Sequence, residues 1–205
     1  MIQNNEVTVN NKPITIGDKA EPNDVIKING KEIKKEKKLY FMLNKPKDYI
    51  TTTDDLYNRK KVTDLIPTKE RIYPVGRLDR DAQGILILTN DGDFANKIMH
   101  PSNNVSKTYE VILDKKIDSK DILQLKKGIK IDKTFVKSKA RILEDNKVEI
   151  TVHVGVHKVV KRLFKILGYY VKKLKRTKIG KLRVDVPIGS FRELDEKDFK
   201  QILGE

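Results

Sequence analysis

The stretch PVGRLDRDAQGILILTNDGD, from Pro74 to Asp93, places a cluster of charges directly before a run of branched aliphatic residues. The run Ile85–Leu88 predicts a short, fully buried strand. Asp79 lies between Arg77 and Arg80, in a loop at the entrance to that strand. Charged groups at the edge of an apolar strand are costly to bury unless they are paired or used. The charges of this loop are therefore the first candidates for a functional role.

Two glycines bracket the loop, and they permit backbone angles that other residues avoid. They are Gly76 and Gly84. Taken alone, the pattern has three interpretations. The charges could be solvated surface groups, or they could belong to a functional site. Asp79 and Asp81 could also form the carboxylate pair of a hydrolase, but that chemistry needs a metal ion or a base and the sequence offers no obvious supplier of either.

The composition favours a folded protein with an anionic partner. The chain has 205 residues and is 38% hydrophobic, which suffices for one large domain or for one and a half small ones. It is also 36% charged, with a formal net charge of +15. Such an excess of positive charge favours a nucleic acid as the partner, with a membrane surface second. No lipidation motif supports the membrane alternative.

Several classes of function are excluded or disfavoured. The sequence has no cysteine, which excludes disulfides and is compatible with a reducing cytoplasm. Its histidines, His100, His153 and His157, lack the spacing of a zinc site, so we expect no metal. No apolar run approaches the roughly 18 residues that a membrane span needs, and no signal peptide is visible. We therefore expect a cytoplasmic protein without a membrane segment.

The order of the predicted elements indicates an α+β fold. Strands outnumber helices and do not alternate regularly with them, which favours a mixed, mainly antiparallel sheet over a doubly wound one. Charged residues 31–38 read as a linker, and residues 62–66 as a short helix or strand. Strands are expected at 6–9, 25–28, 39–46, 85–88, 107–113 and 147–154, and helices at 93–100, 119–128 (with Ser119 as its cap and Gly128 as its stop), 157–168 and 195–203.

The predicted helix 157–168 is strongly amphipathic. Between His157 and Val184 the chain has eleven Lys or Arg and no acid. The charged face could be merely solvated, but RNA phosphates would relieve its self-repulsion. The apolar arc comprises Val159, Val160, Leu163, Phe164, Ile166 and Leu167, and the basic arc Lys158, Lys161, Arg162 and Lys165.

An aromatic residue stands in the predicted strand KTYEV. This residue, Tyr109, follows Lys107 by two positions. A tyrosine in a strand is usually a core or interface residue. Beside a basic surface it could instead stack on an extruded base.

These segments together resemble a known family. GRLDRDAQGILILTNDG, followed by KTYEV, resembles the RsuA-like ribosomal RNA pseudouridine synthases. FMLNKP, YYVKKLKRTKIGKLRV and GSFREL are similar to further segments of that family. The similarity runs from about Leu39 to Leu203. It implies a pseudouridine synthase fold, a mixed mainly antiparallel sheet flanked by helices, over residues 37–205. Residues 1–36 resemble the second half of an S4 RNA-binding domain, which implies a small, truncated S4-like β segment.

The resemblance also implies site residues. Asp79 corresponds to the catalytic aspartate, Tyr109 to the tyrosine that packs on the target uracil, and Lys161 to the basic partner of the aspartate. Lys161, with Arg77, is expected to stabilise the ionised carboxylate. Neither a cofactor nor a metal is implied. The residues expected to bind the substrate are Arg77, Leu78, Lys107, Lys158 and Arg162.

The chain departs from the family pattern near Lys161. Val154, Val156 and Val159 stand where polar residues are usual, and Ala82 replaces a threonine. Polar groups expected near the RNA would then be missing. This motivates an alternative, a non-catalytic RNA-binding or ribosome-assembly factor on the same scaffold.

The activity implied is isomerisation of a uridine in ribosomal RNA. The N1–C1′ bond breaks, the base turns, and C5 joins C1′, with Asp79 acting either covalently or by removing the 2′ proton. RIYPVGRLD and DGDFANKIMHP favour 23S over 16S rRNA, and we expect a monomer. One geometric expectation separates enzyme from binding factor: the Asp79 carboxylate and the Lys161 ammonium should be neighbours in one cleft.

Overall fold

The computed structural model describes residues 1–21, 23–33 and 36–204, and these divide into two compact units. Unit 1 spans Met1–Lys37 and unit 2 spans Lys38–Glu205. The boundary falls within one residue of the one expected from the sequence. That residues 1–36 are S4-like stays a prediction.

Unit 1 contains a small antiparallel sheet with the order β2-β1-β3-β4. The expected strands pair in register, with Val7 opposite Ile28. Asn29 and Gly30 turn the chain with positive φ angles of 48° and 76°, as the turn signal indicated. The linker expected at 31–38 is partly wrong, because β4 begins at Lys31, and residues 34–35 lie outside the described residues. The elements are η1 (Ile2–Asn4), β1 (Val7–Val9), β2 (Lys12–Pro13), β3 (Ile26–Ile28) and β4 (Lys31–Glu32).

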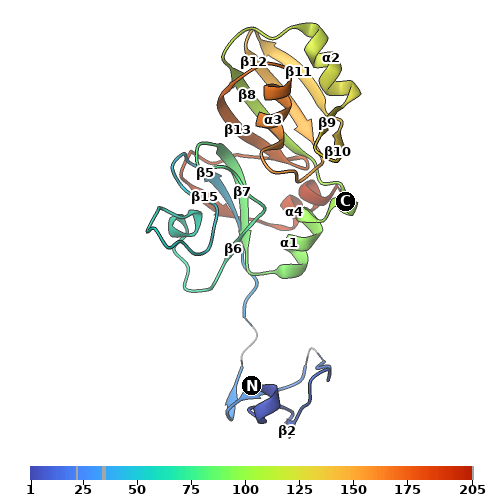
Figure 1. Ribbon diagram of the computed structural model, residues 1–205. Helices are drawn as coiled ribbons and strands as arrows, with labels where there is room; N and C mark the ends of the chain where they lie inside the picture. Colours follow the sequence, from blue (N-terminus) through green and yellow to red (C-terminus); the bar gives the residue numbers. More distant parts are fainter. Residues whose placement is uncertain (22, 34–35, 205) are drawn as a thin grey trace. The chain divides into compact units, whose positions relative to one another are not determined.

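Unit 2 is built on a mixed sheet that falls into two halves (Figure 1). Its strand order is β11-β12-β8-β13-β7-β5-β15, with β14 beside β13 and β6 beside β7. The strands are β5 (Tyr40–Lys45), β6 (Tyr73–Val75), β7 (Gln83–Thr89), β8 (Lys107–Leu113), β11 (Lys139–Glu144), β12 (Lys147–Val152), β13 (Val171–Ile179), β14 (Leu182–Arg183) and β15 (Phe191–Glu193), and a separate hairpin pairs β9 (Ile129–Ile131) with β10 (Thr134–Val136).

The two halves of the sheet meet where β13 runs parallel to β7. All other strand pairings of this sheet among the described residues are antiparallel, so the expected mixed, mainly antiparallel sheet is confirmed. The parallel contact is short and joins Lys175 to Gln83 and Arg176 to Gly84. The catalytic loop predicted from the sequence therefore enters the sheet at the junction of its halves.

The strand β7 is buried on both faces, as its continuous aliphatic run indicated. Leu86 and Leu88 contribute to one hydrophobic cluster, and Ile85 and Ile87 to a second. Each of these side chains is 0% exposed. Full burial of such a side chain contributes roughly 1.5–3 kcal/mol, so this strand is a stable support for the loop that precedes it.

Four α-helices flank the sheet of unit 2 among the described residues, as the family resemblance implied. Asp91 caps the first by accepting hydrogen bonds from the backbone of Asp93 and Phe94. In the second, Asp118 rather than Ser119 occupies the N-cap position, without a side-chain capping hydrogen bond, and Ser119 begins the helix. Residues 62–66 give a 3-10 turn. The helices are α1 (Gly92–Met99), α2 (Ser119–Lys127), α3 (Val159–Ile166) and α4 (Glu196–Leu203), with 3-10 helices η2 (Val62–Leu65) and η3 (Pro101–Asn103).

The basic helix α3 is shorter than expected, beginning at Val159 rather than at residue 157. Lys158 precedes it with a positive φ of 50°. Four of the apolar residues are buried as predicted, whereas Ile166, at the last turn, is 55% exposed. The helix thus packs by its first two turns and directs Lys161 toward the loop before β7.

Candidate active site

The loop before β7 depends on its two glycines for its path. Gly76 and Gly84 have φ angles of 77° and 110°, in the region that side-chain-bearing residues rarely adopt. At Gly84 a Cβ atom would also overlap the backbone carbonyl of Arg176 on β13. Glycine is therefore required where the two halves of the sheet touch, and the loop is fixed at its entrance to β7.

A buried lysine holds the loop from below. Lys45, the last residue of β5, is 0% exposed. Its Nζ donates to the carbonyl oxygens of Asp79 at 3.1 Å and Ala82 at 2.9 Å, and to that of Pro46 at 2.9 Å. Burial lowers the pKa of Lys45 to about 8, although the carboxylates of Asp81 and Asp79 partly oppose that change. This ammonium therefore joins the end of β5 to several backbone carbonyls of the loop.

Two further side chains secure the loop from the flanks. The hydroxyl of Thr51 donates to the carbonyl oxygen of Leu78 at 2.7 Å. Arg176, which is 4% exposed, donates from Nε to the carbonyl oxygen of Ile85 at 2.8 Å, and its Nη1 lies 3.5 Å from the carbonyl oxygen of Arg77. The backbone on either side of Asp79 is therefore held by side chains from β5, β13 and the segment that follows β5.

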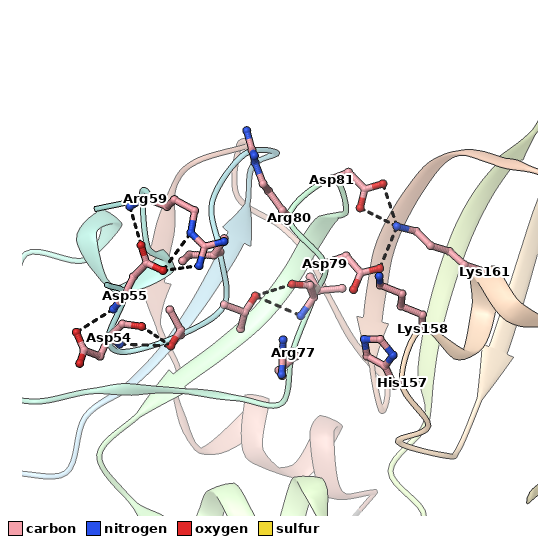
Figure 2. A pocket seen from close by; sticks show the side chains of 14 residues that line it. Asp54, Asp55, Arg59, Arg77, Asp79, Arg80, Asp81, His157, Lys158 and Lys161 are labelled. Atoms are coloured by element: carbon pink, nitrogen blue, oxygen red, sulfur yellow. Dashed lines mark hydrogen bonds and ion pairs between the residues drawn. The ribbon is translucent and has the colours of Figure 1, made fainter. Parts of the chain in front are cut away.

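At the mouth of the loop one lysine bridges both acids. Lys161 on α3 places its Nζ 2.9 Å from Oδ2 of Asp79 and 2.7 Å from Oδ1 of Asp81 (Figure 2). The Asp79 side chain is 25% exposed, whereas that of Asp81 is 70% exposed. The acids are therefore not equivalent, because Asp79 is the more enclosed and Asp81 faces solvent.

The electrostatics of this cluster favour charged groups. Burial by itself would lower the pKa of Lys161, but hydrogen bonds to Asp81 and Asp79 outweigh that effect and raise it. The hydrogen bond from Lys161 holds the pKa of Asp81 below its usual value. At neutral pH the lysine is therefore a fixed cation between two carboxylates.

A cleft of about 560 Å³ opens beside this cluster. Its walls come from the loop before β7, from the start of α3 and from the segment after β5 (Figure 2). A cleft of this size is ordinary for a small-ligand site or a single nucleotide. The lining residues are Ile50, Thr51, Thr52, Asp54, Asp55, Arg59, Arg77, Leu78, Asp79, Arg80, Asp81, His157, Lys158 and Lys161.

Five of the residues predicted for the site line this cleft. Asp79, Lys161, Arg77, Leu78 and Lys158 are all present in its wall. The expectation that Arg77 pairs with Asp79 is not met, because among the described residues the ion pair of Asp79 is with Lys161.

Three predicted residues lie elsewhere. Tyr109 is 9% exposed and packs in the larger hydrophobic cluster. The Nζ of Lys107 donates to the carbonyl oxygen of Val105 at 2.7 Å, and burial lowers the pKa of Lys107 to about 8. Arg162 pairs with Asp132. None of the three lines the cleft.

The valines that depart from the family pattern are core residues. Val159 is 6% exposed, and Val154 and Val156 are partly buried against the larger hydrophobic cluster. None of them lines the cleft. Their apolar character therefore supports the packing of α3 and takes no polar group away from the wall around Asp79.

Lys45 and Arg176 were missed by the sequence reasoning, although both left a signal. Lys45 is the last residue of an apolar strand and stands directly before Pro46. Arg176 has the same parity as the buried Leu174 in β13, so strand periodicity places it on the inner face.

Neither a metal site nor a membrane segment is found in the described part of the chain. No group of three or more His, Cys, Asp or Glu side chains there could hold a metal ion. No helix there combines the length and the apolar character needed to cross a bilayer.

The structure thus places a lysine-paired aspartate on a loop at the junction of a two-part mixed sheet, beside a cleft. Residues 39–184 match the model of the RNA pseudouridylate synthase family, and the chain belongs to that family. Such enzymes convert uridine to pseudouridine.

Individual relatives agree with this assignment. The chain is 38% identical to the ribosomal large subunit pseudouridine synthase B of Bacillus subtilis, over 98% of this chain and 87% of that protein. It is 36% identical to the dual-specificity RNA pseudouridine synthase RluF of Escherichia coli, over 96% of this chain and 69% of that protein. A crystal structure of a pseudouridylate synthase superposes with a TM-score of 0.77 at 28% identity, over 98% of this chain and 90% of that one.

Proposed function

We propose that this protein is an RNA pseudouridine synthase that isomerises a specific uridine of ribosomal RNA, with Asp79 as the catalytic residue. The observation that carries the proposal is the 2.9 Å contact between Lys161 Nζ and Asp79 Oδ2 at the wall of the cleft. The proximity of these two groups is the criterion that was set from the sequence to distinguish an enzyme from a binding factor. The family of the chain supplies the reaction.

In the reaction, Asp79 must be ionised and must reach the ribose of the bound uridine. It then either attacks C1′ or removes the 2′ proton, and the N1–C1′ bond breaks. Lys161, which belongs to α3, holds the Asp79 carboxylate through their 2.9 Å ion pair and fixes its direction. The base turns within the closed site and C5 joins C1′, so the step needs no cofactor.

The target uridine has to leave its stack to reach Asp79. We propose that Arg77 and Lys158, which line the cleft, hold the flanking phosphates, and that Leu78 contacts the base. We propose that Tyr109, Lys107 and Arg162 also contact the substrate. This requires that RNA binding move their side chains away from their present partners.

The substrate is proposed as 23S rather than 16S rRNA. The name of the Bacillus subtilis relative supports a large-subunit target. The net charge of +15 supports binding to a polyanion. We further propose that residues 1–36 contribute RNA contacts as a partial S4-like segment, and that the protein acts in the cytoplasm as a monomer.

The alternative of a non-catalytic RNA-binding or assembly factor was motivated by Val154, Val156 and Val159. These residues pack against the hydrophobic cluster, and their apolar character is therefore weaker support for this alternative. The ion pair between Asp79 and Lys161 does not involve them.

The proposal is tested by tritium release from rRNA labelled at C5 of uridine, because C5 loses its hydrogen when it joins C1′. We expect release with 23S rRNA and a much smaller amount with 16S rRNA. Tight RNA binding without release, even with enzyme in excess over RNA, would support the assembly factor instead.

A further inference from the structure

The segment that forms one wall of the cleft carries two exposed apolar side chains at its tip. Leu56 is 92% exposed and Tyr57 is 78% exposed, the two highest values for large hydrophobic residues among those the structure describes. Single exposed apolar residues are normal, but this adjacent pair lies in the chain between Asp55 and Arg59, which both line the cleft, and such a pair indicates a contact surface.

The tip is held in place by its neighbour Asp55, whose side chain is 4% exposed. The carboxylate accepts hydrogen bonds from the backbone nitrogens of Tyr57 at 3.1 Å and Arg59 at 2.8 Å, and from Nε of Arg59 at 3.0 Å. The Arg59 side chain, followed by its backbone, lowers the pKa of Asp55 to about 2. The backbone of the turn is therefore held by one carboxylate on both sides of Tyr57.

A cation adjoins the exposed ring. The guanidinium carbon of Arg59 lies 5.2 Å from the centroid of the Tyr57 ring, and the residue still keeps 78% of its surface open. An open aromatic face beside a guanidinium suits a nucleotide, because the base can stack on the ring while a phosphate lies near the cation.

The tip is coupled to the catalytic loop. Asp55 and Arg59 line the same cleft as Asp79. At the base of the segment, Thr51 donates its 2.7 Å hydrogen bond to the carbonyl oxygen of Leu78, one residue before Asp79. A nucleotide that contacts the tip would therefore bind to the same segment that forms one wall of the cleft.

We propose that Tyr57 stacks on an unpaired nucleobase beside the target uridine, with Leu56 packing against the same nucleotide. The inference rests on the proposed function, since it requires that the cleft receive a uridine of RNA. It adds a substrate contact that holds the opened strand next to the cleft, independent of base identity because every base has a face to stack.

The test is RNA affinity by fluorescence anisotropy, with a fluorescein-labelled stem-loop whose loop contains unpaired uridines. The full chain carries Asp79→Asn so that the RNA stays unmodified. We expect Tyr57→Ala to weaken binding by about fivefold or more and Tyr57→Phe to bind within about twofold of its parent, as stacking predicts. The control is Tyr170→Ala, which removes a tyrosine that is 71% exposed and does not lie in the segment between the cleft residues Asp55 and Arg59, and it should bind like the parent.

Three outcomes overturn the inference: Tyr57→Ala binds as tightly as its parent, Tyr57→Phe binds as weakly as Tyr57→Ala, or Tyr170→Ala loses as much affinity as Tyr57→Ala. Tritium release by the protein with Asp79 intact separates this result from the proposed function. Normal release with no effect of Tyr57→Ala on affinity refutes the stacking role alone. No release together with the expected affinity loss refutes the enzyme and leaves the RNA contact.

Discussion

The buried ammonium of Lys45 should make the stability of the protein depend on pH in a defined direction. The pKa of Lys45 falls from 10.5 to about 8 in the folded protein because of burial. The folded state therefore releases this proton before the unfolded state does. Between pH 8 and 10.5 the unfolded chain holds more protons, so the contribution of Lys45 to stability rises with pH.

The size of the effect follows from linkage. Taking the two pKa values, the free energy of unfolding of the wild type should gain about 2 kcal/mol between pH 7 and 9.5 from this group alone. Lys45→Met removes the titration and leaves the carbonyls of Asp79 and Ala82 without their donor. The free energy of unfolding of the wild type minus that of the variant should therefore rise by that amount over the same interval.

The assay is urea unfolding followed by far-ultraviolet circular dichroism at pH 7 and 9.5. Lys47→Met, at an exposed lysine two residues along the chain, controls for the loss of a positive charge. If the free energy of unfolding of the wild type minus that of Lys45→Met stays constant or falls between pH 7 and 9.5, the reasoning is refuted. The same result for Lys47→Met as for Lys45→Met would show that burial is not the cause.

Two further substitutions test the loop and its partner. Gly84→Ala should lower the free energy of unfolding by more than about 2 kcal/mol, because its Cβ overlaps the Arg176 backbone, whereas Gly76→Ala, with open space around it, should cost about 1 kcal/mol. Thermal unfolding measures both, and equal losses would argue against the close approach. Lys161→Met should reduce the kcat of tritium release at least about tenfold, because two carboxylates then face each other unpaired, and Lys161→Arg should recover part of it. Full activity of the methionine variant would contradict the role given to the ion pair.

Much of the fold was readable from the chain because local signals agreed with one another. A few neighbouring residues suffice to determine three local structures: the aliphatic run of β7, the Asp91 cap of α1 and the asparagine-glycine turn at residues 29–30. The start of α2 was misplaced by one residue, because Asp118 and Ser119 are both good caps and only the backbone decides between them.

The candidate site was only partly readable. The contact between Asp79 and Lys161 joins residues far apart in sequence, and it followed from the resemblance, not from spacing. Lys107 and Arg162 were expected at the substrate because they are basic, yet each is satisfied by groups nearer to it, the carbonyl of Val105 and the carboxylate of Asp132. Charge alone does not tell which cations are already engaged.

The supports beneath the loop could not be derived from composition. Lys45 lies at the end of the apolar strand β5 and Arg176 in the Lys-rich strand β13, and their contacts with the loop and with β7 are created only by tertiary pairing. Val154 and Val156 were suspected of weakening the site because the sequence does not show that they pack against the hydrophobic cluster.

The central claim is that Asp79, and not its neighbour Asp81, performs the chemistry. The most direct measurement compares tritium release from 5-labelled uridine in rRNA by Asp79→Asn and Asp81→Asn. Asp79→Asn should release no tritium above background, while Asp81→Asn, at a side chain that is 70% exposed, should retain measurable activity. Normal release by Asp79→Asn would contradict the account.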